Sequence, residues 1–147
     1  MKLLLALALS LAVLPAIAQT RAVNGVDIKP GAKVEVIFFT AEDCSYCTRW
    51  KNANKDEFLK WAQKSNVTFR EVSKRRIAHP YEAAHFPPEA GYAWEQVRAS
   101  GKVKFLIPRW IVYADQRKVV DGAGLNDWNR VFRFVGDVTE ARDQAAK

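Results

Sequence analysis

Residues 34–47 read VEVIFFTAEDCSYC and contain both cysteines of the chain. The first six residues are β-branched or aromatic apart from Glu35, which predicts a buried strand. Beyond the second cysteine, side chains recur at intervals of three or four residues, which predicts a helix to about Gln63. These positions are Cys47, Trp50, Asn54, Phe58 and Trp61. The cysteine pair therefore lies at a strand-to-helix junction, with residues 40–43 as the turn and Cys44 at the helix start.

The predicted place of Cys44 favours thiolate chemistry. Unpaired backbone N–H groups and the helix dipole at a first turn stabilise negative charge, so a thiol there loses its proton more readily than a free one. Cys47 lies one turn further along the same face and can attack a mixed disulfide formed on Cys44. The pattern predicts Cys44 as the catalytic nucleophile and Cys47 as the resolving cysteine of a redox-active disulfide, with no other cofactor.

Other uses of the pair are weighed against this one. Haem attachment needs a histidine directly after the second cysteine, where this sequence has Thr48. Zinc needs two further ligands, and the histidines, His79 and His85, lie far downstream at a spacing unlike that of a compact finger. A structural disulfide across so short a loop removes little unfolded-state entropy. A reactive dithiol is the favoured interpretation, while a metal-binding protein that uses the CxxC pair and a non-catalytic binding module remain alternatives.

The N-terminus has the pattern of a secretory signal. After Met1-Lys2, residues 3–18 are apolar apart from Ser10, contain Pro15 and end in Ala-Ile-Ala, a small-x-small cleavage pattern. The run is shorter than the roughly 20 residues that a spanning helix needs. We therefore expect a signal peptide over residues 1–18 and a periplasmic or secreted mature protein with no stable membrane insertion. Disulfides persist in such compartments.

Composition bounds the remaining possibilities. A chain of 147 residues has room for one domain. Its content of 49% hydrophobic and 27% charged residues is typical of globular proteins and not of disordered ones. The formal net charge of +7 bears on partners and not on the fold. A solvated basic surface is the simpler interpretation of that charge, steering of acidic partners is the other, and the predicted export argues against nucleic-acid binding.

The rest of the chain alternates strands and helices. Strands are expected at residues 67–72, 105–114 and 117–121, and helices at 89–100 and after Gly124. Pro108 is unusual inside a strand because proline cannot donate to the ladder. An irregular stretch covers residues 74–88, and its part from Tyr81 to Pro88 is longer than a connection needs and is either a lip over the cysteines or a surface loop. This order of elements predicts an α/β fold.

Three features, in this order, resemble the thioredoxin-like oxidoreductases: a strand ending in Cys44-Ser45-Tyr46-Cys47 at a helix start, a later strand opening with Ile107-Pro108, and a hairpin before the last helix. The resemblance covers nearly all of residues 33–136. It implies a central mixed β-sheet flanked by helices, with a small insertion before the proline strand. It also implies that Pro108 is cis and packs beside the two sulfurs, where the backbone of Ile107 pairs with an extended substrate chain. Ser45, Tyr46, Ile107 and Pro108 are therefore the expected substrate-binding residues.

The resemblance implies a thiol-disulfide oxidoreductase of cell redox homeostasis. Its expected partners are protein thiols or disulfides in the exported compartment and a redox partner that recycles the cysteine pair. The sequence departs from thioredoxin at Asp43, where thioredoxin has tryptophan, and at Phe38, where the family has a buried acid. The expected division of the chain is a signal peptide at 1–18, an N-terminal extension at 19–32, a thioredoxin-like domain at 33–138 and a polar C-terminal tail at 139–147.

Overall fold

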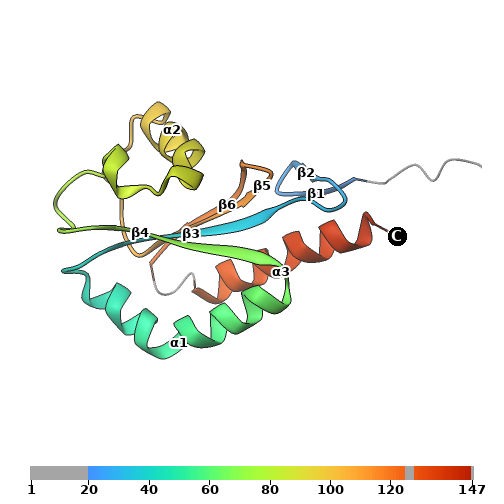
Figure 1. The fold of residues 1–147 in the computed structure, drawn as a ribbon, viewed down its shortest axis with the longest axis horizontal. Coiled ribbons are helices and arrows are strands. Elements are labelled where there is room, and N and C mark those ends of the chain that lie inside the picture. The colour runs from blue at the N-terminus through green and yellow to red at the C-terminus, as the bar shows by residue number, and fades with distance from the viewer. Residues whose placement is uncertain (1–19, 125–127, 147) are drawn as a thin grey trace, which may run out of the picture.

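The computed structural model describes residues 20–124 and 128–146. In these residues the chain forms a mixed four-stranded sheet with helices on both faces, as predicted (Figure 1). The signal peptide predicted at 1–18 lies outside the described residues, and so does Leu125, one of the apolar positions predicted for the last helix. No helix within the described ranges combines the length and the apolar character needed to cross a membrane.

The N-terminal extension forms a small hairpin. Strands β1 (Arg21–Val23) and β2 (Val26–Ile28) pair antiparallel around Asn24 and Gly25, whose φ angles are 50° and 76°. Both residues are in the left-handed region, which a two-residue hairpin turn of this kind requires and which Asn-Gly adopts readily. The Asn24 side chain donates to the carbonyl of Val119, 3.2 Å away. This bond ties the extension to the main sheet.

The main sheet has the strand order β4-β3-β5-β6. Its central strand β3 (Val34–Ala41) pairs parallel with β4 (Val67–Lys74) and antiparallel with β5 (Arg109–Ala114), which pairs antiparallel with β6 (Arg117–Ala123). Every residue of β3 is buried except Glu35, which is partly buried. The parallel pair needs a crossover connection, and a helix supplies it.

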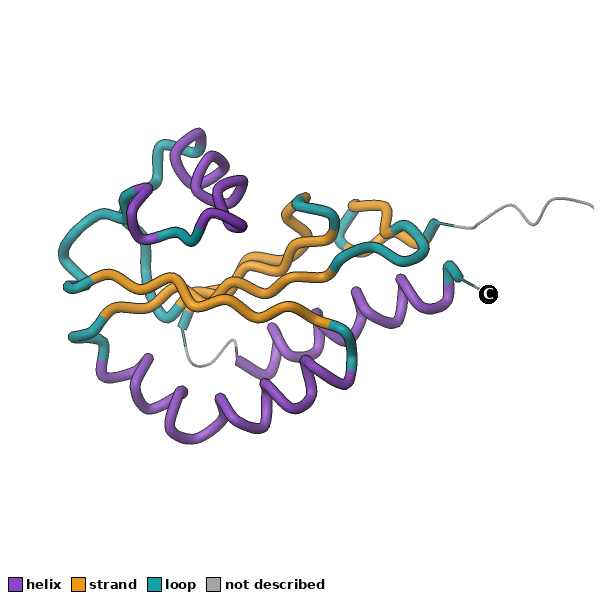
Figure 2. Tube along the Cα trace, in the orientation of Figure 1, coloured by secondary structure: helices purple, strands orange, loops and turns teal. Residues whose placement is uncertain are grey.

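Helices cover the two faces of the sheet unequally. Helices α1 (Ser45–Lys64) and α3 (Trp128–Gln144) lie on one face, and α2 (Gly91–Ala99) lies on the other (Figures 1 and 2). Two 3₁₀ turns precede α2, at Ala83–His85 and Pro88–Ala90. The helix ends predicted near Gln63 and at residues 89–100 therefore agree with the structure to within about two residues.

Two neighbouring phenylalanines of β3 anchor the two sides of the core. Phe38 points toward α1, and its ring centroid is 4.2 Å from that of Trp110 and 4.8 Å from that of Trp50. Phe39 points to the other face, where its ring contacts Tyr81 and Phe105 at 5.3 and 5.1 Å. Side chains alternate across a strand, so these adjacent residues contribute to separate layers.

The strand predicted at residues 105–114 begins later than expected. It starts at Arg109, directly after Pro108, because proline has no N–H to donate to the sheet ladder. The carbonyl of Pro108 instead accepts from the N–H of Gly124, 2.7 Å away, at the end of β6. Pro108 therefore lies directly before the first residue of β5.

The last helix runs further than predicted. It continues to Gln144, so the domain end placed at residue 138 falls inside α3 and most of the tail expected at 139–147 is helical. The reason is the side chain of Arg142, which is buried and donates to the carbonyls of Ser65 and Asn66 at 3.1 and 3.2 Å. These carbonyls lie just beyond the end of α1, where helix carbonyls lack intrahelical partners.

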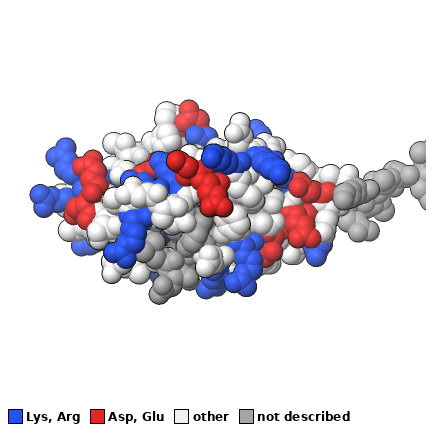
Figure 3. All heavy atoms as spheres, turned by 90° about the horizontal axis from the view of Figure 1, so that it is seen from below, with Lys and Arg blue, Asp and Glu red and all other residues white. Residues whose placement is uncertain are grey.

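Surface charge is mixed on the side that carries α1 and α3. Figure 3 shows lysine and arginine side chains distributed over this side, with aspartate and glutamate between them. Several of these charges form partly exposed ion pairs, such as Lys51 and Lys55 with Glu71. On this side, positive and negative side chains therefore lie interspersed.

Candidate active site

The cysteine pair lies at the first turn of α1. Cys44 is the N-cap residue, with φ −89° and ψ 96°, and its N–H donates to the carbonyl of Ala41, 3.1 Å away. Cys44 and Cys47 are joined by a disulfide, and their Cα atoms are 5.2 Å apart. The junction predicted from the sequence is therefore present, with the cysteines in their oxidised form.

The helix start presents a hydrogen-bond donor to the Cys44 sulfur. The N–H of Cys47 donates to Cys44 Sγ at 3.2 Å. No acidic residue lies in the first turn of α1. A donor aimed at sulfur, together with the positive end of a 20-residue helix, favours the thiolate over the thiol once the disulfide is reduced.

The two cysteines are well shielded from solvent. Cys44 is 2% exposed and Cys47 is fully buried. Three large apolar side chains are exposed on segments at this end of the sheet: Tyr46 at 57%, Ile77 at 43% and Leu106 at 70%. The guanidinium of Arg49 lies 5.5 Å from the centre of the Tyr46 ring. The surface at this end of the sheet therefore offers apolar and cationic contacts, while the pair itself is buried.

The Ile107–Pro108 peptide bond is cis, as the resemblance implies. Both residues are buried. Arg109, directly after the proline, pairs in register with Phe39, near the carboxyl end of β3. The cysteine turn begins at that same end, so the fold brings the predicted substrate-binding residues Ile107 and Pro108 to the end of the sheet that carries the disulfide.

The irregular segment after β4 is fastened beside the cysteines. The N–H of Ile77 donates to the Asp43 carboxylate at 2.8 Å, directly next to Cys44. The hydroxyl of Tyr81 donates to the carbonyl of Thr40 at 2.9 Å. These two bonds hold Ile77 and Tyr81 next to the segment that leads into the cysteine pair. The bond from Ile77 also gives the Asp43 carboxylate, next to Cys44, a hydrogen-bond donor from another segment.

Lys74 is the main residue of this region that sequence reasoning missed. The sequence treats it as the first of three solvated basic residues, yet it is 2% exposed. Its ammonium donates to the carbonyls of Ile77 and His79 at 3.0 and 2.5 Å and lies 4.4 Å from the centre of the Tyr81 ring. Burial, and secondarily the charge of Lys104, lowers the pKa of Lys74. Nothing in the sequence separates this lysine from Arg75 and Arg76.

The two histidines weighed as zinc ligands have other roles. His85 accepts a hydrogen bond at Nδ1 from the N–H of Glu82, 2.8 Å away, and His79 offers its carbonyl to Lys74. Among residues 20–124 and 128–146, no group of three or more His, Cys, Asp or Glu side chains is placed to hold a metal ion.

Comparison with known proteins gives likenesses of structure. No protein-family model matches the sequence, and no curated protein matches it. Among solved structures, the periplasmic thioredoxin SoxS from Paracoccus pantotrophus matches with 14% identity and a TM-score of 0.46, over 71% of this chain and 97% of that one. The oxidised thioredoxin from Plasmodium falciparum matches with 15% identity and a TM-score of 0.45, over 73% and 82%.

The oxidoreductase DsbH matches with 18% identity and a TM-score of 0.46, over 71% of this chain and 74% of that one. Two of these structures are thioredoxins, and the third is an oxidoreductase. In this chain, the thioredoxin-like fold is evident from the strand order, the disulfide at the start of α1 and the cis Ile107–Pro108 bond.

Proposed function

We propose that this chain is an exported thiol-disulfide oxidoreductase that exchanges disulfides with protein partners. The observation that carries the proposal is the arrangement of Cys44, which caps α1, is bonded to Cys47 and lies at the same end of the sheet as the cis Ile107–Pro108 bond. Two cysteines one helical turn apart can cycle between dithiol and disulfide. The reaction requires only their sulfur atoms and those of the partner.

In the reducing direction, the Cys44 thiolate attacks one sulfur of a partner disulfide. The partner S–S bond breaks, a mixed disulfide forms on Cys44, and the other partner sulfur leaves as a thiolate that takes up a proton. Cys47 then loses its proton and attacks Cys44 Sγ, which releases the second partner thiol and restores the Cys44–Cys47 disulfide. Two electrons pass to the partner, and the same steps in reverse oxidise a partner dithiol.

Different tasks for the two cysteines are supported by their burial and hydrogen bonding. Cys44 retains a small exposed surface and accepts the N–H of Cys47, whereas Cys47 is fully buried. A partner therefore meets Cys44 first, and Cys47 is within reach of the resulting mixed disulfide because the Cα atoms are 5.2 Å apart. These observations support Cys44 as nucleophile and Cys47 as resolving residue.

The surroundings support a polypeptide partner. Tyr46, between the cysteines, and Leu106, just before the cis Ile107–Pro108 bond, are more than half exposed and offer apolar contact. By its resemblance to the thioredoxin-like proteins, the backbone of Ile107 would pair with an extended partner chain, with Ser45, Tyr46 and Pro108 beside it. Such a chain places its own cysteine sulfur next to Cys44.

Variants of the two cysteines test this assignment. Cys47→Ala should accumulate a covalent complex with a partner protein, while Cys44→Ala should abolish insulin reduction with dithiothreitol as electron donor. The double variant is the matched control, because it should neither trap a partner nor reduce insulin. Insulin reduction by Cys44→Ala at the parental rate would show that the nucleophile is assigned wrongly.

Burial of the pair favours one alternative, a non-catalytic binding module whose disulfide is inert. A brief treatment with dithiothreitol, followed by a thiol-alkylating probe and mass measurement, separates the two. A reactive pair takes up two labels under native conditions, and an inert one takes up none. The reduction potential of the pair then gives the direction of electron flow, since 30 mV corresponds to about 1.4 kcal/mol.

Export is proposed from the N-terminal sequence. Mass measurement of the protein recovered from a secreting host should show loss of residues 1–18. Replacement of residues in the apolar run 3–14 by charged ones should retain the precursor in the cytoplasm. Recovery of the full chain from the exported fraction would contradict the predicted cleavage.

A further inference from the structure

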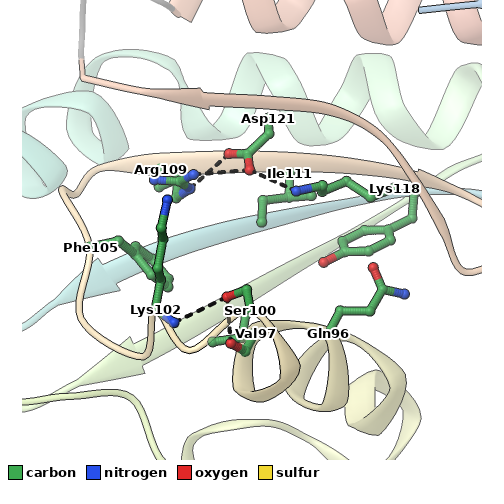
Figure 4. A pocket seen from close by; sticks show the side chains of 10 residues that line it. Gln96, Val97, Ser100, Lys102, Phe105, Arg109, Ile111, Lys118 and Asp121 are labelled. Atoms are coloured by element: carbon green, nitrogen blue, oxygen red, sulfur yellow. Dashed lines mark hydrogen bonds and ion pairs between the residues drawn. The ribbon is translucent and has the colours of Figure 1, made fainter. Parts of the chain in front are cut away.

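A pocket of about 260 Å³ lies between α2 and the β5-β6 hairpin. Figure 4 shows Lys102, Phe105 and Arg109 toward one end of it, with Asp121 and Lys118 beyond them. Its walls are partly apolar, formed by Phe105 together with Val97 and Ile111. None of these residues belongs to the cysteine site described above.

The pocket carries more positive than negative charge. Asp121 is the single acid among the described residues that line it, and it accepts from the Arg109 guanidinium at 2.7 and 2.9 Å and from Lys118 at 3.2 Å. Although burial opposes ionisation, these two cations hold the pKa of Asp121 below its ordinary value. Lys102 forms no ion pair with any residue that the structure describes. Three cations thus face one carboxylate.

The pocket also contains an unsatisfied hydrogen-bond donor. Every second residue of β5 faces the pocket, and these residues are Arg109, Ile111 and Tyr113. The residue is 1% exposed, and its hydroxyl has no hydrogen-bond partner among the described residues. Burial raises the pKa of Tyr113, so the hydroxyl keeps its proton. A buried hydroxyl without a partner is unfavourable, and an oxygen acceptor in the pocket would relieve it.

The position of the pocket relates it to the partner chain. Phe105 and Arg109 flank the turn that contains Leu106 and the cis Ile107–Pro108 bond, and the Arg109 guanidinium lies 4.9 Å from the centre of the Phe105 ring. Two residues of the pocket wall therefore flank, along the chain, the backbone at which a partner would pair. An extended chain advances about 3.3 Å per residue, so a side chain about two or three residues from the partner's cysteine can reach it.

We propose that this pocket receives a carboxylate side chain of the partner polypeptide, glutamate above all. The carboxylate would accept from the Tyr113 hydroxyl and pair with Lys102, while the apolar stem packs against Phe105. The inference rests on the proposed function and deepens it, because it makes the pocket a determinant of partner choice. Substrates with an acidic residue two or three positions from the reactive cysteine would be preferred.

Matched peptides test this proposal. Each peptide carries one cysteine as a mixed disulfide with thiopyridine, and Cys44 attack at the peptide sulfur releases neutral thiopyridone, whose absorbance gives the rate. Four peptides carry glutamate at the second or third position on either side of the cysteine. Four control peptides carry glutamine at the same positions. Charge-assisted hydrogen bonds contribute about 1.5–3 kcal/mol, so reduced wild type should favour glutamate about tenfold or more at one of these positions.

Two variants and a control locate the effect. Lys102→Gln and Tyr113→Phe should each lower the glutamate-to-glutamine rate ratio severalfold. Lys104→Gln removes the same charge from the same exposed segment but lies outside the pocket, and it should keep the ratio. Because the ratio compares two substrates of one protein, it does not depend on how fast that variant reacts.

The outcomes are distinct. A ratio near one at all four positions in wild type would overturn the pocket proposal, and so would an equal fall in Lys104→Gln, which would indicate long-range charge steering. Reaction with both peptides at equal rates would leave the proposed oxidoreductase function standing. Failure of reduced wild type to release thiopyridone from any peptide would instead count against that function.

Discussion

The two faces of the sheet differ in what packs against them. Toward α1 and α3, the layer is a continuous set of aromatic rings in mutual contact: Phe38, Trp50, Phe58, Phe69 and Trp110. Toward α2, rings gather near the cysteine end around Phe39, and a separate pair, Tyr92 and Tyr113, lies further along the sheet. Beyond that end the α2 face carries charged and hydroxyl groups. The α1 face is therefore packed by aromatic rings throughout, whereas the α2 face combines buried apolar side chains with charged pairs.

Some polar groups of the α2 face are hydrogen-bonded, and one buried hydroxyl is not. The Tyr92 hydroxyl donates to Glu35 at 2.6 Å, and Glu35 also pairs with Arg70 at 3.1 Å. On the same face the Tyr113 hydroxyl has no partner among the described residues. Apolar packing is non-directional and leaves few unmet requirements, whereas a polar layer leaves groups that a ligand can satisfy. A ligand is therefore more readily accommodated on the α2 face than on the α1 face.

The largest expected effect compares the neighbouring residues Phe38 and Phe39. Both are fully buried, and alanine at either position should lower the free energy of unfolding by about 3–5 kcal/mol. The loss should be greater for Phe38→Ala, because its neighbours Trp50 and Trp110 lie on a helix and a central strand that cannot collapse into the cavity. The neighbours of Phe39 include irregular segments that can relax. Urea denaturation measures both losses.

Hydrogen exchange adds a second measurement to this pair. Phe39→Ala should speed exchange selectively in the irregular segment from residue 75 to 90, whereas Phe38→Ala should speed it throughout the sheet. A larger loss for Phe39→Ala, with exchange uniform across the chain, would mean that the α2 face is as rigid as the aromatic one. The contrast between the faces would then be one of composition only.

Patterns local in sequence predicted the framework of the molecule. The run before the cysteines and the helical spacing after them placed β3, α1 and Cys44, because strand and helix periods are visible over ten to twenty residues. The cis state of Pro108 followed from the family resemblance. The Asn24-Gly25 turn was available as a hairpin signal and was not used.

The groups that distinguish this protein depend on contacts between distant segments. Lys74 is buried because the chain folds back over it toward His79, and Arg142 is buried because α3 ends beside the α1–β4 turn. The sequence pattern placed Lys74 among the basic surface residues and Arg142 in the polar C-terminal tail. The pocket at Tyr113 requires α2 to lie over β5, which no local period predicts. Sequence therefore anticipated the cysteine junction but not the surface around it.

An intermediate effect compares two tyrosines whose ring centroids are 5.1 Å apart. Tyr92→Phe removes the bond to the Glu35 carboxylate and should cost about 1.5–3 kcal/mol of unfolding free energy. Tyr113→Phe removes a hydroxyl with no partner among the described residues and should be neutral, or stabilising by up to about 1 kcal/mol. Thermal and urea unfolding of the two variants measure the difference. Equal losses would mean that Tyr113 already has an acceptor.

The smallest expected effect on stability comes from replacing one carboxylate on each face. Glu71 bonds Lys51 and Lys55 on the α1 side, and Asp121 bonds Arg109 and Lys118 on the α2 side. For both acids burial favours the neutral form, but the hydrogen bonds from the cations are stronger in sum and hold the pKa below the ordinary values of 4.5 and 3.8. Their stabilisation is therefore present above those values and is lost as pH falls through the lowered pKa.

Glu71→Gln and Asp121→Asn should each reduce stability at neutral pH by less than about 1 kcal/mol and should flatten the decline of stability below about pH 4.5. Asp121→Asn should have the larger effect, because the bond from Arg109 uses both carboxylate oxygens. The double variant should be additive, since the two ion pairs share no partner. Urea unfolding across the acid range measures all three. A non-additive double variant would show that the two faces are coupled through the sheet, and the polar face would then be part of the same stability unit as the aromatic one.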